Sequence, residues 1–145
     1  MAYKLGKRSL RNLIGVHPEL AFAVNEALKI SEVDFGVTEG VRSMARQRKL
    51  VKQGRSKTLK SYHLNGLAAD LVPYIDGNYR WDSNSAFKKI SRAMKVIIEK
   101  HGLDIQNGFD MWSWDKPHYQ LMKIDGKSAR SVYDIRKIDP VRFPG

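Results

Sequence analysis

The sequence predicts a single α+β domain. The chain has 145 residues, which is the length of one domain with its own core. Apolar residues recur at helical spacing in some segments and alternate with polar residues in others. Because these segments do not follow the regular strand–helix–strand order of a parallel sheet, we expect α+β rather than α/β.

Two helices are predicted in the first half of the chain. Residues 17–31 have a proline suited to a first turn and carry Leu20, Val24 and Leu28 at helical spacing. Residues 43–53 begin with a serine that can cap a helix, and a glycine follows them. A basic loop then runs to residue 60.

The longest predicted helix follows Asp82 or Ser83, either of which can cap it, and ends at Gly102. Its apolar stripe consists of Phe87, Ile90, Met94 and Ile97. Strands are predicted at residues 33–41, 67–75, 78–81 and 117–122, with a hairpin turn at Asp76-Gly77. Residues 123–145 are polar and basic, and we expect them to form a loosely packed tail behind a functional core of about residues 18–122.

The composition excludes several classes of protein. The chain has no cysteine, so disulfides, thiolate zinc fingers and cysteine nucleophiles are ruled out. Its first fifteen residues lack the unbroken apolar region of a signal peptide, and no stretch approaches the ~20 apolar residues of a membrane span. We therefore expect a protein without an export signal or a membrane anchor. We also expect it to be a monomer.

The charge is strongly positive, since 26 basic and 15 acidic residues give a net charge of +11. Such a charge attracts polyanions, so nucleic acid and an anionic bacterial envelope are both candidate partners, and simple solubility is the third explanation. The densest basic cluster is either a docking patch or the solvated face of a helix and loop. It consists of Arg46, Arg48, Lys49, Lys52, Arg55, Lys57 and Lys60.

An aspartate inside an apolar strand is the first sign of a functional site. In "SYHLNGLAADLV", residues 61–72, Asp70 lies seven residues after His63. A carboxylate is costly there unless it is paired or bound to a cation. The Asn65-Gly66 turn could bring His63 back over the strand. His63 and Asp70 are therefore two candidate ligands of a three-ligand metal site.

The third ligand should be another histidine. His17 precedes a helix start, and His101 lies at a helix end, where a basic residue complements the helix dipole, so both have structural explanations. His118 lies in "WSWDKPHYQL", at the start of a predicted strand. With His63 and Asp70 it makes a nitrogen, nitrogen, oxygen set that suits zinc and leaves a fourth position for water.

Asp115 lies three residues before His118 and adds an acidic group near the proposed metal. Hydrolysis at a metal needs such a carboxylate, which takes a proton from water and returns it to the leaving amine. Spacing alone leaves open that each of these residues has a purely structural role.

Two motifs resemble those of the zinc DD-peptidase and endolysin family, which includes the VanX/VanY-type peptidases and the phage L-alanyl-D-glutamate endopeptidases. "SYHLNGLAAD" matches S-x-H-x-x-G-x-A-x-D, and "DKPH" matches the later acidic-x-x-H. "EGVRSMARQ" resembles an upstream G-x-R-x-x-x-x-Q element. Many relatives have glutamate where Asp115 stands, and in having aspartate this sequence resembles the phage endopeptidases. "NGFDMWSWD" only loosely preserves the family's G-G-D-W-like stretch.

The resemblance implies the DD-peptidase-like (hedgehog/DD-peptidase) α+β fold, with an antiparallel sheet and flanking helices. It implies zinc held by His63, Asp70 and His118, with Asp115 as general acid and base. Arg42 would anchor the substrate and the transition state, and Gln47 and Ser61 are the further candidates for substrate binding. By the same resemblance, Arg42 would be catalytic as well as substrate-binding.

The implied function is hydrolysis of peptidoglycan stem peptides, by a phage endolysin that cleaves the L-alanyl-D-glutamate bond. Such an enzyme accumulates in the host cytoplasm and reaches the wall after holin-type release. The alternatives are a D-Ala-D-Ala carboxypeptidase and a non-catalytic, zinc-stabilised module that binds the wall or nucleic acid. Asp115 argues against the second alternative, because a structural zinc site closes its fourth position and needs no spare acid.

Overall fold

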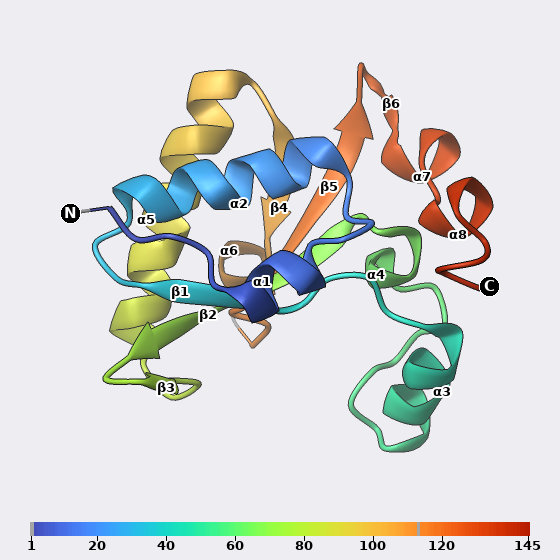
Figure 1. Ribbon diagram of the computed structural model, residues 1–145, viewed down its shortest axis with the longest axis horizontal. Helices are drawn as coiled ribbons and strands as arrows, with labels where there is room; N and C mark the ends of the chain where they lie inside the picture. Colours follow the sequence, from blue (N-terminus) through green and yellow to red (C-terminus); the bar gives the residue numbers. More distant parts are fainter. Residues whose placement is uncertain (1, 113) are drawn as a thin grey trace.

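The computed structural model describes residues 2–112 and 114–145. Its centre is an antiparallel sheet whose four main strands lie in the order β1-β2-β5-β4 (Figure 1). These strands are β1 Phe35–Glu39, β2 Ala68–Ile75, β5 His118–Ile124 and β4 Asp104–Asn107. The predicted antiparallel sheet with flanking helices is confirmed.

Two short strands extend this sheet. β3, Asn78–Tyr79, pairs with the end of β2 through a tight turn in which Asp76 and Gly77 have φ values of 52° and 79°. This is the hairpin predicted from the Asp-Gly pair. β6, Lys127–Ser128, pairs in the same way with the end of β5.

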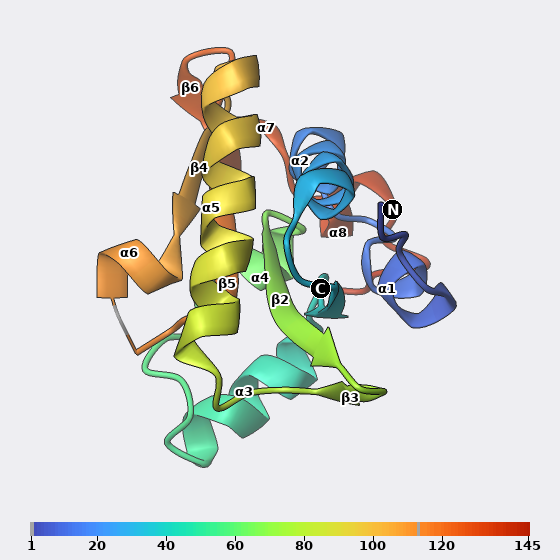
Figure 2. The same ribbon diagram turned by 90° about the vertical axis from the view of Figure 1, so that its left-hand side faces the viewer.

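Helices α2, Pro18–Ile30, and α5, Asn84–His101, pack against each other and against the sheet (Figure 2). Both have the predicted start signals, and Ser83 rather than Asp82 caps α5, because its hydroxyl accepts a hydrogen bond from the Ala86 N–H. The buried faces of the two helices meet the inner side chains of β1, β2 and β5 in one core. This core fixes the strands that carry the site described below.

The remaining helices are short and lie around the sheet. α3, Met44–Lys52, is capped by Ser43 as predicted and projects from the body together with the loop after it (Figures 1 and 2). The basic cluster between residues 46 and 60 lies on this projection. The others are α1 Lys7–Asn12, α4 Tyr62–Asn65, α6 Gly108–Trp112, α7 Ala129–Val132 and α8 Ile135–Ile138. Within the described residues no helix is long and apolar enough to cross a membrane.

The C-terminal region is more ordered than the expected loose tail. Ala129 and Ile135 are buried, and the Tyr133 hydroxyl donates a hydrogen bond of 2.8 Å to the Gly15 carbonyl oxygen. The Arg130 guanidinium lies over the Tyr62 ring, 3.8 Å from its centroid. The expectation was wrong because isolated apolar residues in a basic segment show no helical or strand periodicity. These residues are nevertheless buried or bonded by contacts with residues far away in the sequence.

The chain passes very close to itself at Gly40, directly after β1. A Cβ atom at this position would collide with the backbone carbonyl oxygen of Asn12, which cannot swing away as a flexible side chain would. The approach lets the Asn12 amide donate to the Val37 carbonyl oxygen at 2.7 Å, so α1 is fastened to β1. Glycine is therefore required where β1 ends.

We predict that Gly40→Ala destabilises the protein by about 2 kcal/mol or more, since overpacking against backbone forces a shift of α1. The measurement is urea unfolding followed by circular dichroism. Gly6→Ala is the matched control, because no atom lies within 4 Å of a Cβ placed there, and its cost should stay within about 1 kcal/mol. Equal stability of the two variants would contradict this account of Gly40.

Candidate active site

Asp70 and His118 face each other across two adjacent strands. In the antiparallel pairing of β2 with β5 they are direct partners, so both side chains leave the same face of the sheet. His118 Nδ1 is 3.4 Å from Asp70 Oδ1. The sheet register thus brings together two residues that are 48 positions apart in the sequence.

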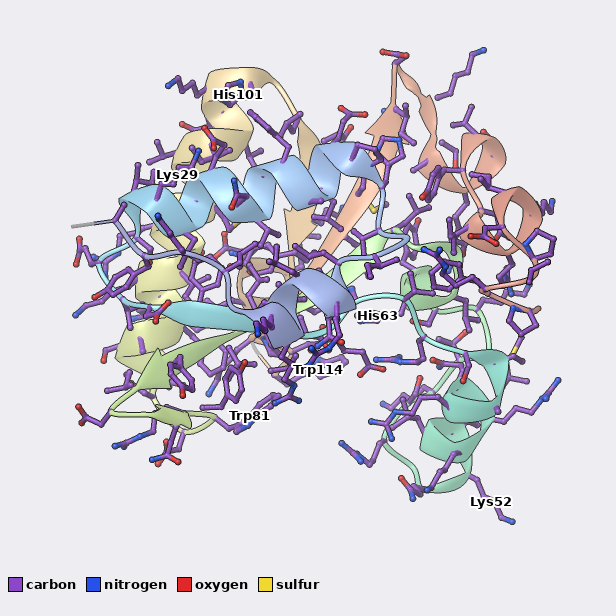
Figure 3. The ribbon with its side chains drawn as sticks, viewed as in Figure 1. Lys29, Lys52, His63, Trp81, His101 and Trp114 are labelled. Atoms are coloured by element: carbon purple, nitrogen blue, oxygen red, sulfur yellow. The ribbon has the colours of Figure 1, made fainter. Side chains whose placement is uncertain are left out.

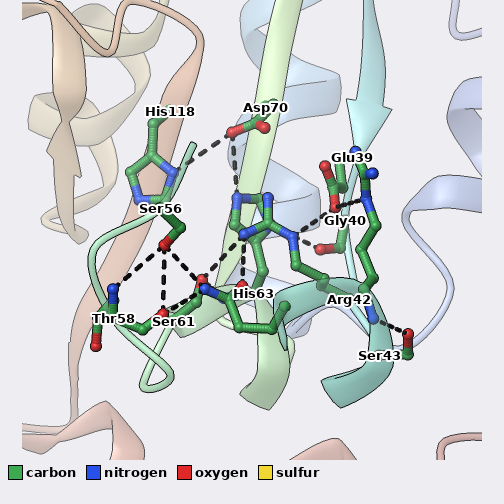
Figure 4. Close-up of polar contacts among 12 residues, drawn as sticks. Glu39, Gly40, Arg42, Ser43, Ser56, Thr58, Ser61, His63, Asp70 and His118 are labelled. Atoms are coloured by element: carbon green, nitrogen blue, oxygen red, sulfur yellow. Dashed lines mark hydrogen bonds and ion pairs between the residues drawn. The ribbon is translucent and has the colours of Figure 1, made fainter. Parts of the chain in front are cut away.

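His63 reaches the same carboxylate from the one-turn helix α4. Ser61 caps this helix by accepting the His63 N–H, and Gly66 ends it in the left-handed conformation, with φ 82°. The sequence predicted only a turn here, but a helical turn serves the same purpose, since it carries His63 back over β2. His63 Nε2 lies 3.2 Å from Asp70 Oδ1, as Figure 4 shows.

A backbone carbonyl determines which nitrogen of His63 faces Asp70. His63 Nδ1 is 2.8 Å from the Gly40 carbonyl oxygen, which can only accept a hydrogen bond. Nδ1 therefore carries the proton, and in the neutral ring Nε2 points its lone pair at Asp70. A hydrogen bond from one ring nitrogen to a carbonyl is the usual way in which proteins orient a metal-binding histidine.

Gln120 orients His118 so that the other ring nitrogen, Nε2 instead of Nδ1, carries the proton. His118 Nε2 lies 2.8 Å from Gln120 Oε1, while the Gln120 amide nitrogen points at Met122 Sδ at 3.1 Å. Nε2 therefore donates, and in the neutral ring Nδ1 presents its lone pair to Asp70. Gln120 was missed in the sequence, although it lies two residues after His118 and hence on the same face of the strand.

The three side chains can hold a metal ion. One ligand atom from each of His63, Asp70 and His118 lies within 4.8 Å of the other two. Two atoms bound at about 2.1 Å to a tetrahedral ion are about 3.4 Å apart, and the two nitrogen-to-carboxylate distances of 3.2 and 3.4 Å agree with that spacing.

The surroundings of Asp70 Oδ1 show whether a metal ion suits this group of side chains. This oxygen is buried and has no hydrogen-bond donor within the described part of the chain, even though two ring nitrogens face it. Lone pairs directed at a carboxylate are unfavourable, so either protons on the rings or a cation between the three groups must relieve the contact. The donor set of two imidazoles and one carboxylate suits zinc.

Protonation of the histidines accounts for the electrostatics of the metal-free site. Burial disfavours the charged form of Asp70, but the positive charge on His63 and the hydrogen bond from His118 outweigh burial and hold the pKa of Asp70 well below its usual range. Burial likewise lowers the pKa of His118, but the hydrogen bond and the charge of Asp70 outweigh it, so the pKa of His118 is raised above 6.5.

Asp115 lies beside this cluster. Burial raises the pKa of the Asp115 carboxyl, and the negative charge of Asp70 raises it further, while the positive charges on His118, His63 and Arg42 lower it. Its backbone oxygen accepts the His118 N–H at 3.3 Å, which fixes the loop before β5 to His118. A half-buried carboxyl at this place can exchange a proton with a group bound at the cluster.

Arg42 is held by three side chains on the other side of His63. Its Nε donates to Glu39 Oε1 at 2.5 Å, and one terminal nitrogen lies 2.8 Å from Gln47 Oε1 and 3.5 Å from Ser61 Oγ (Figure 4). Its backbone N–H also donates to the His63 carbonyl oxygen. Glu39, which lies on β1 opposite Asp70 on β2, was not among the residues predicted for the site.

Gln47 is completely buried and joins Arg42 to the loop after α3. Its amide nitrogen donates to Ser56 Oγ at 2.9 Å and to the Thr58 carbonyl oxygen at 2.6 Å, while its oxygen accepts from Arg42. Every polar atom of this side chain thus has a protein partner.

The other two histidines have the structural roles expected of them. His17 caps α2 by accepting the Glu19 N–H at 3.1 Å, and His101 lies in the last turn of α5 against the Phe22 ring. Figure 3 shows His63 near the centre of the molecule and His101 at its edge. The structure brings together the two histidines predicted for the site, whereas His17 and His101 lie elsewhere in the structural positions expected of them.

Comparison with known proteins agrees with this arrangement. The family model of the phage L-alanyl-D-glutamate peptidases matches residues 1–134. This chain belongs to that family. It is 31% identical over 137 residues to the L-alanyl-D-glutamate peptidase of Escherichia phage T5, with 92% of this chain and 95% of that protein covered.

A solved structure shows the same fold. The L-Ala D-Glu endopeptidase ChiX of Serratia marcescens superposes with a TM-score of 0.76 at 38% identity, covering 83% of this chain and 90% of that chain. The family suggested by the two sequence motifs, and the fold that it implied, are confirmed.

We predict that the stability of the metal-free protein falls as the pH rises above about 6.5, the unfolded-state pKa of histidine. The folded-state pKa of His118 lies above its unfolded value near 6.5, so its charged form stabilises the fold fully below that pH, and the stabilisation is lost as the pH passes the folded pKa. The measurement is Tm against pH in the presence of a chelator. Asp70→Asn should flatten this part of the profile, and an unchanged slope in that variant would refute the pairing.

Proposed function

We propose that this chain is a zinc-dependent peptidoglycan endopeptidase that hydrolyses the L-alanyl-D-glutamate bond of stem peptides. The observation that carries the proposal is the meeting of two oriented histidine lone pairs on one buried carboxylate oxygen, in a chain of this family. Zinc would be held by His63 Nε2, His118 Nδ1 and Asp70 Oδ1. A bound zinc ion would lower the pKa of a water molecule to about 7 and would polarise a carbonyl group.

Asp115 is the proposed general base and acid. Its carboxylate accepts a proton from the attacking water and later gives that proton to the nitrogen of the leaving amine. The raised pKa of the half-buried carboxyl favours this second step, and the positive charge of an ion at the cluster would keep the group ionised for the first.

Arg42 is proposed to bind the substrate carbonyl oxygen or a substrate carboxylate as charge develops. Its guanidinium is planar, and Glu39 and Gln47 orient it before the substrate binds. Little conformational entropy is therefore lost when Arg42 binds the substrate. Ser61 is partly exposed beside it and can contact the peptide. We assign Gln47 to positioning Arg42, since full burial leaves it no surface for substrate.

The alternatives receive less support. The relatives above are described as L-alanyl-D-glutamate peptidases, and no feature of the site favours a D-Ala-D-Ala carboxypeptidase. A purely structural zinc in a binding module would leave Asp115 and the oriented Arg42 without a purpose. We further propose that the enzyme reaches the wall from the host cytoplasm through a holin-type lesion, which the phage relative supports.

We predict that the purified protein binds about one zinc per chain and that chelation abolishes hydrolysis of purified peptidoglycan. His118→Ala should bind less zinc and lose the rise in Tm that zinc gives, because metal binds the folded state. His101→Ala is the matched control and should keep both. Mass spectrometry of the new termini identifies the cleaved bond. Full activity in protein shown to hold no metal would refute the assignment.

We predict that Asp115→Asn keeps zinc and fold but loses hydrolysis by a factor of ~100 to 10,000, the usual worth of general acid–base catalysis. Asp104→Asn, an exposed aspartate on β4, is the control and should leave the rate unchanged. Loss of zinc in the Asp115 variant would instead make this residue a ligand, and a nearly native rate would exclude it from proton transfer.

A further inference from the structure

The projection formed by α3 and the loop after it carries most of the positive charge of the molecule. Residues 43–60 contain seven basic residues and no acidic one, so they supply +7 of the net charge of +11. Figure 1 shows this segment standing away from the body, and Figure 3 shows Lys52 pointing outward at its far end. A surface that serves only solubility mixes both signs of charge, and this segment does not.

The charges of the basic cluster are almost uncompensated. Among the described residues only Arg46 of this cluster has an ion pair, with Glu39 at 3.7 Å. The other six side chains are exposed. Like charges held on one short segment repel one another, and a polyanionic partner relieves this repulsion. The cluster therefore has the character of a docking surface for such a partner.

The projection is fastened to the body of the molecule. The buried Gln47 side chain bonds from α3 to Arg42 and to the loop residues Ser56 and Thr58. The Arg130 side chain also donates to a backbone carbonyl oxygen at the end of this loop. The cationic side chains thus stand on a fixed scaffold, so a partner that binds them is held in one orientation relative to the body.

A cavity of about 260 Å³ adjoins the basic cluster, between the loop after α3 and the helices α7 and α8. Its lining includes three basic and three apolar side chains, which are Lys60, Arg130, Arg136, Met44, Leu59 and Leu64. Arg130 Nε is buried without an acceptor in the described part of the chain. Leu59 and Lys60 belong both to the projection and to the cavity wall, so the two features form one continuous surface.

The mixture of charge and apolar surface distinguishes between polyanions. Leu59 is 49% exposed, although Lys57 and Lys60 are close to it in the sequence. Nucleic acid would meet the cations but would leave this apolar surface in water, and residues 43–60 contain no aromatic side chain on which a base could stack. A phospholipid carries an anionic phosphate and an apolar tail, so it matches both parts of the surface.

We propose that the projection and the adjoining cavity dock the protein on a bilayer that contains anionic phospholipids. The basic cluster attracts the headgroup phosphates, and Leu59 enters the interface beside them. In the cavity, Lys60 and Arg130 donate to one headgroup phosphate, and Met44 and Leu64 contact its glycerol and acyl carbons. The proposal is independent of the proposed reaction, since none of these residues belongs to the metal cluster.

The direct test is co-sedimentation of the full chain with vesicles made of equal parts of phosphatidylglycerol and phosphatidylcholine. We expect binding to these vesicles, none to vesicles of pure phosphatidylcholine, and weaker binding as the salt concentration rises above ~0.1 M. The triple variant Arg48→Gln, Lys52→Gln, Arg55→Gln should bind about 100-fold more weakly, since each basic residue at an anionic surface contributes about 1 kcal/mol.

A second triple variant is the matched control. Lys88→Gln, Lys127→Gln and Lys137→Gln remove the same charge from exposed positions outside the projection. This variant should lose no more than about threefold in vesicle affinity, because charges farther from the bilayer than the screening length contribute little. Circular dichroism checks that both triple variants are folded.

Leu59→Ser separates a bilayer from other polyanions. It should weaken vesicle binding about tenfold, because it removes apolar surface that is buried in the interface. The same substitution should leave binding to double-stranded DNA unchanged, because a DNA backbone offers no apolar layer for this side chain to enter.

The outcomes decide between the partners. Equal losses in the two triple variants, or no binding to phosphatidylglycerol, would overturn the docking surface. Vesicle binding that Leu59→Ser leaves unchanged would overturn the choice of a bilayer, and DNA bound more tightly than vesicles at the same salt would make nucleic acid the partner. Both triple variants should hydrolyse a soluble stem peptide like the wild type. Failure of the wild type in that reaction would overturn the proposed function and leave the docking result standing.

Discussion

The pairing of β2 with β5 is the constraint on which the site depends. Asp70 and His118 meet because they are direct partners in this antiparallel ladder, and side chains alternate between the two faces of a sheet with a period of two. A slip of one residue would send one of them into the core formed by α2 and α5. The apolar neighbours of Asp70 on β2, which are completely buried, thus protect the register of a polar site.

Further residues orient the side chains of the candidate site although they do not belong to the cluster of His63, Asp70 and His118. The Gly40 carbonyl oxygen sets the tautomer of His63, and Gln120 sets that of His118. Glu39 and Gln47 set the direction of Arg42. The contact of Gly40 with His63 joins the end of β1 to α4, whereas Gln120 acts on His118 within β5 and Glu39 acts on Arg42 three residues further along the chain. Placement of the site therefore depends on the folded sheet and on the loops packed on it.

The sequence revealed those features that are encoded locally. α2, α3 and α5 have caps and apolar stripes within a dozen residues, and the Asp-Gly hairpin is a two-residue signal, so each could be predicted. The cluster of His63, Asp70 and His118 was predicted because a carboxylate in an apolar strand is costly. β4 was missed, since Asp104–Asn107 is short and mostly polar and becomes a strand only by pairing with β5. The pairing of Glu39 with Asp70 across two strands and the contact of Tyr133 with Gly15 depend on partners far along the chain, which no local pattern reveals.

The contacts of the C-terminal region with α4 and with Gly15 have a consequence for shortened forms of the chain. The stacking of Arg130 on Tyr62 and the hydrogen bond from Tyr133 to Gly15 come from residues that follow β5 and β6. A chain shortened to the end of β6 would keep His63, Asp70 and His118 but would lose these supports of the helix turn that carries His63. The C-terminal region thus serves the cluster from outside it, although none of its side chains belongs to the cluster.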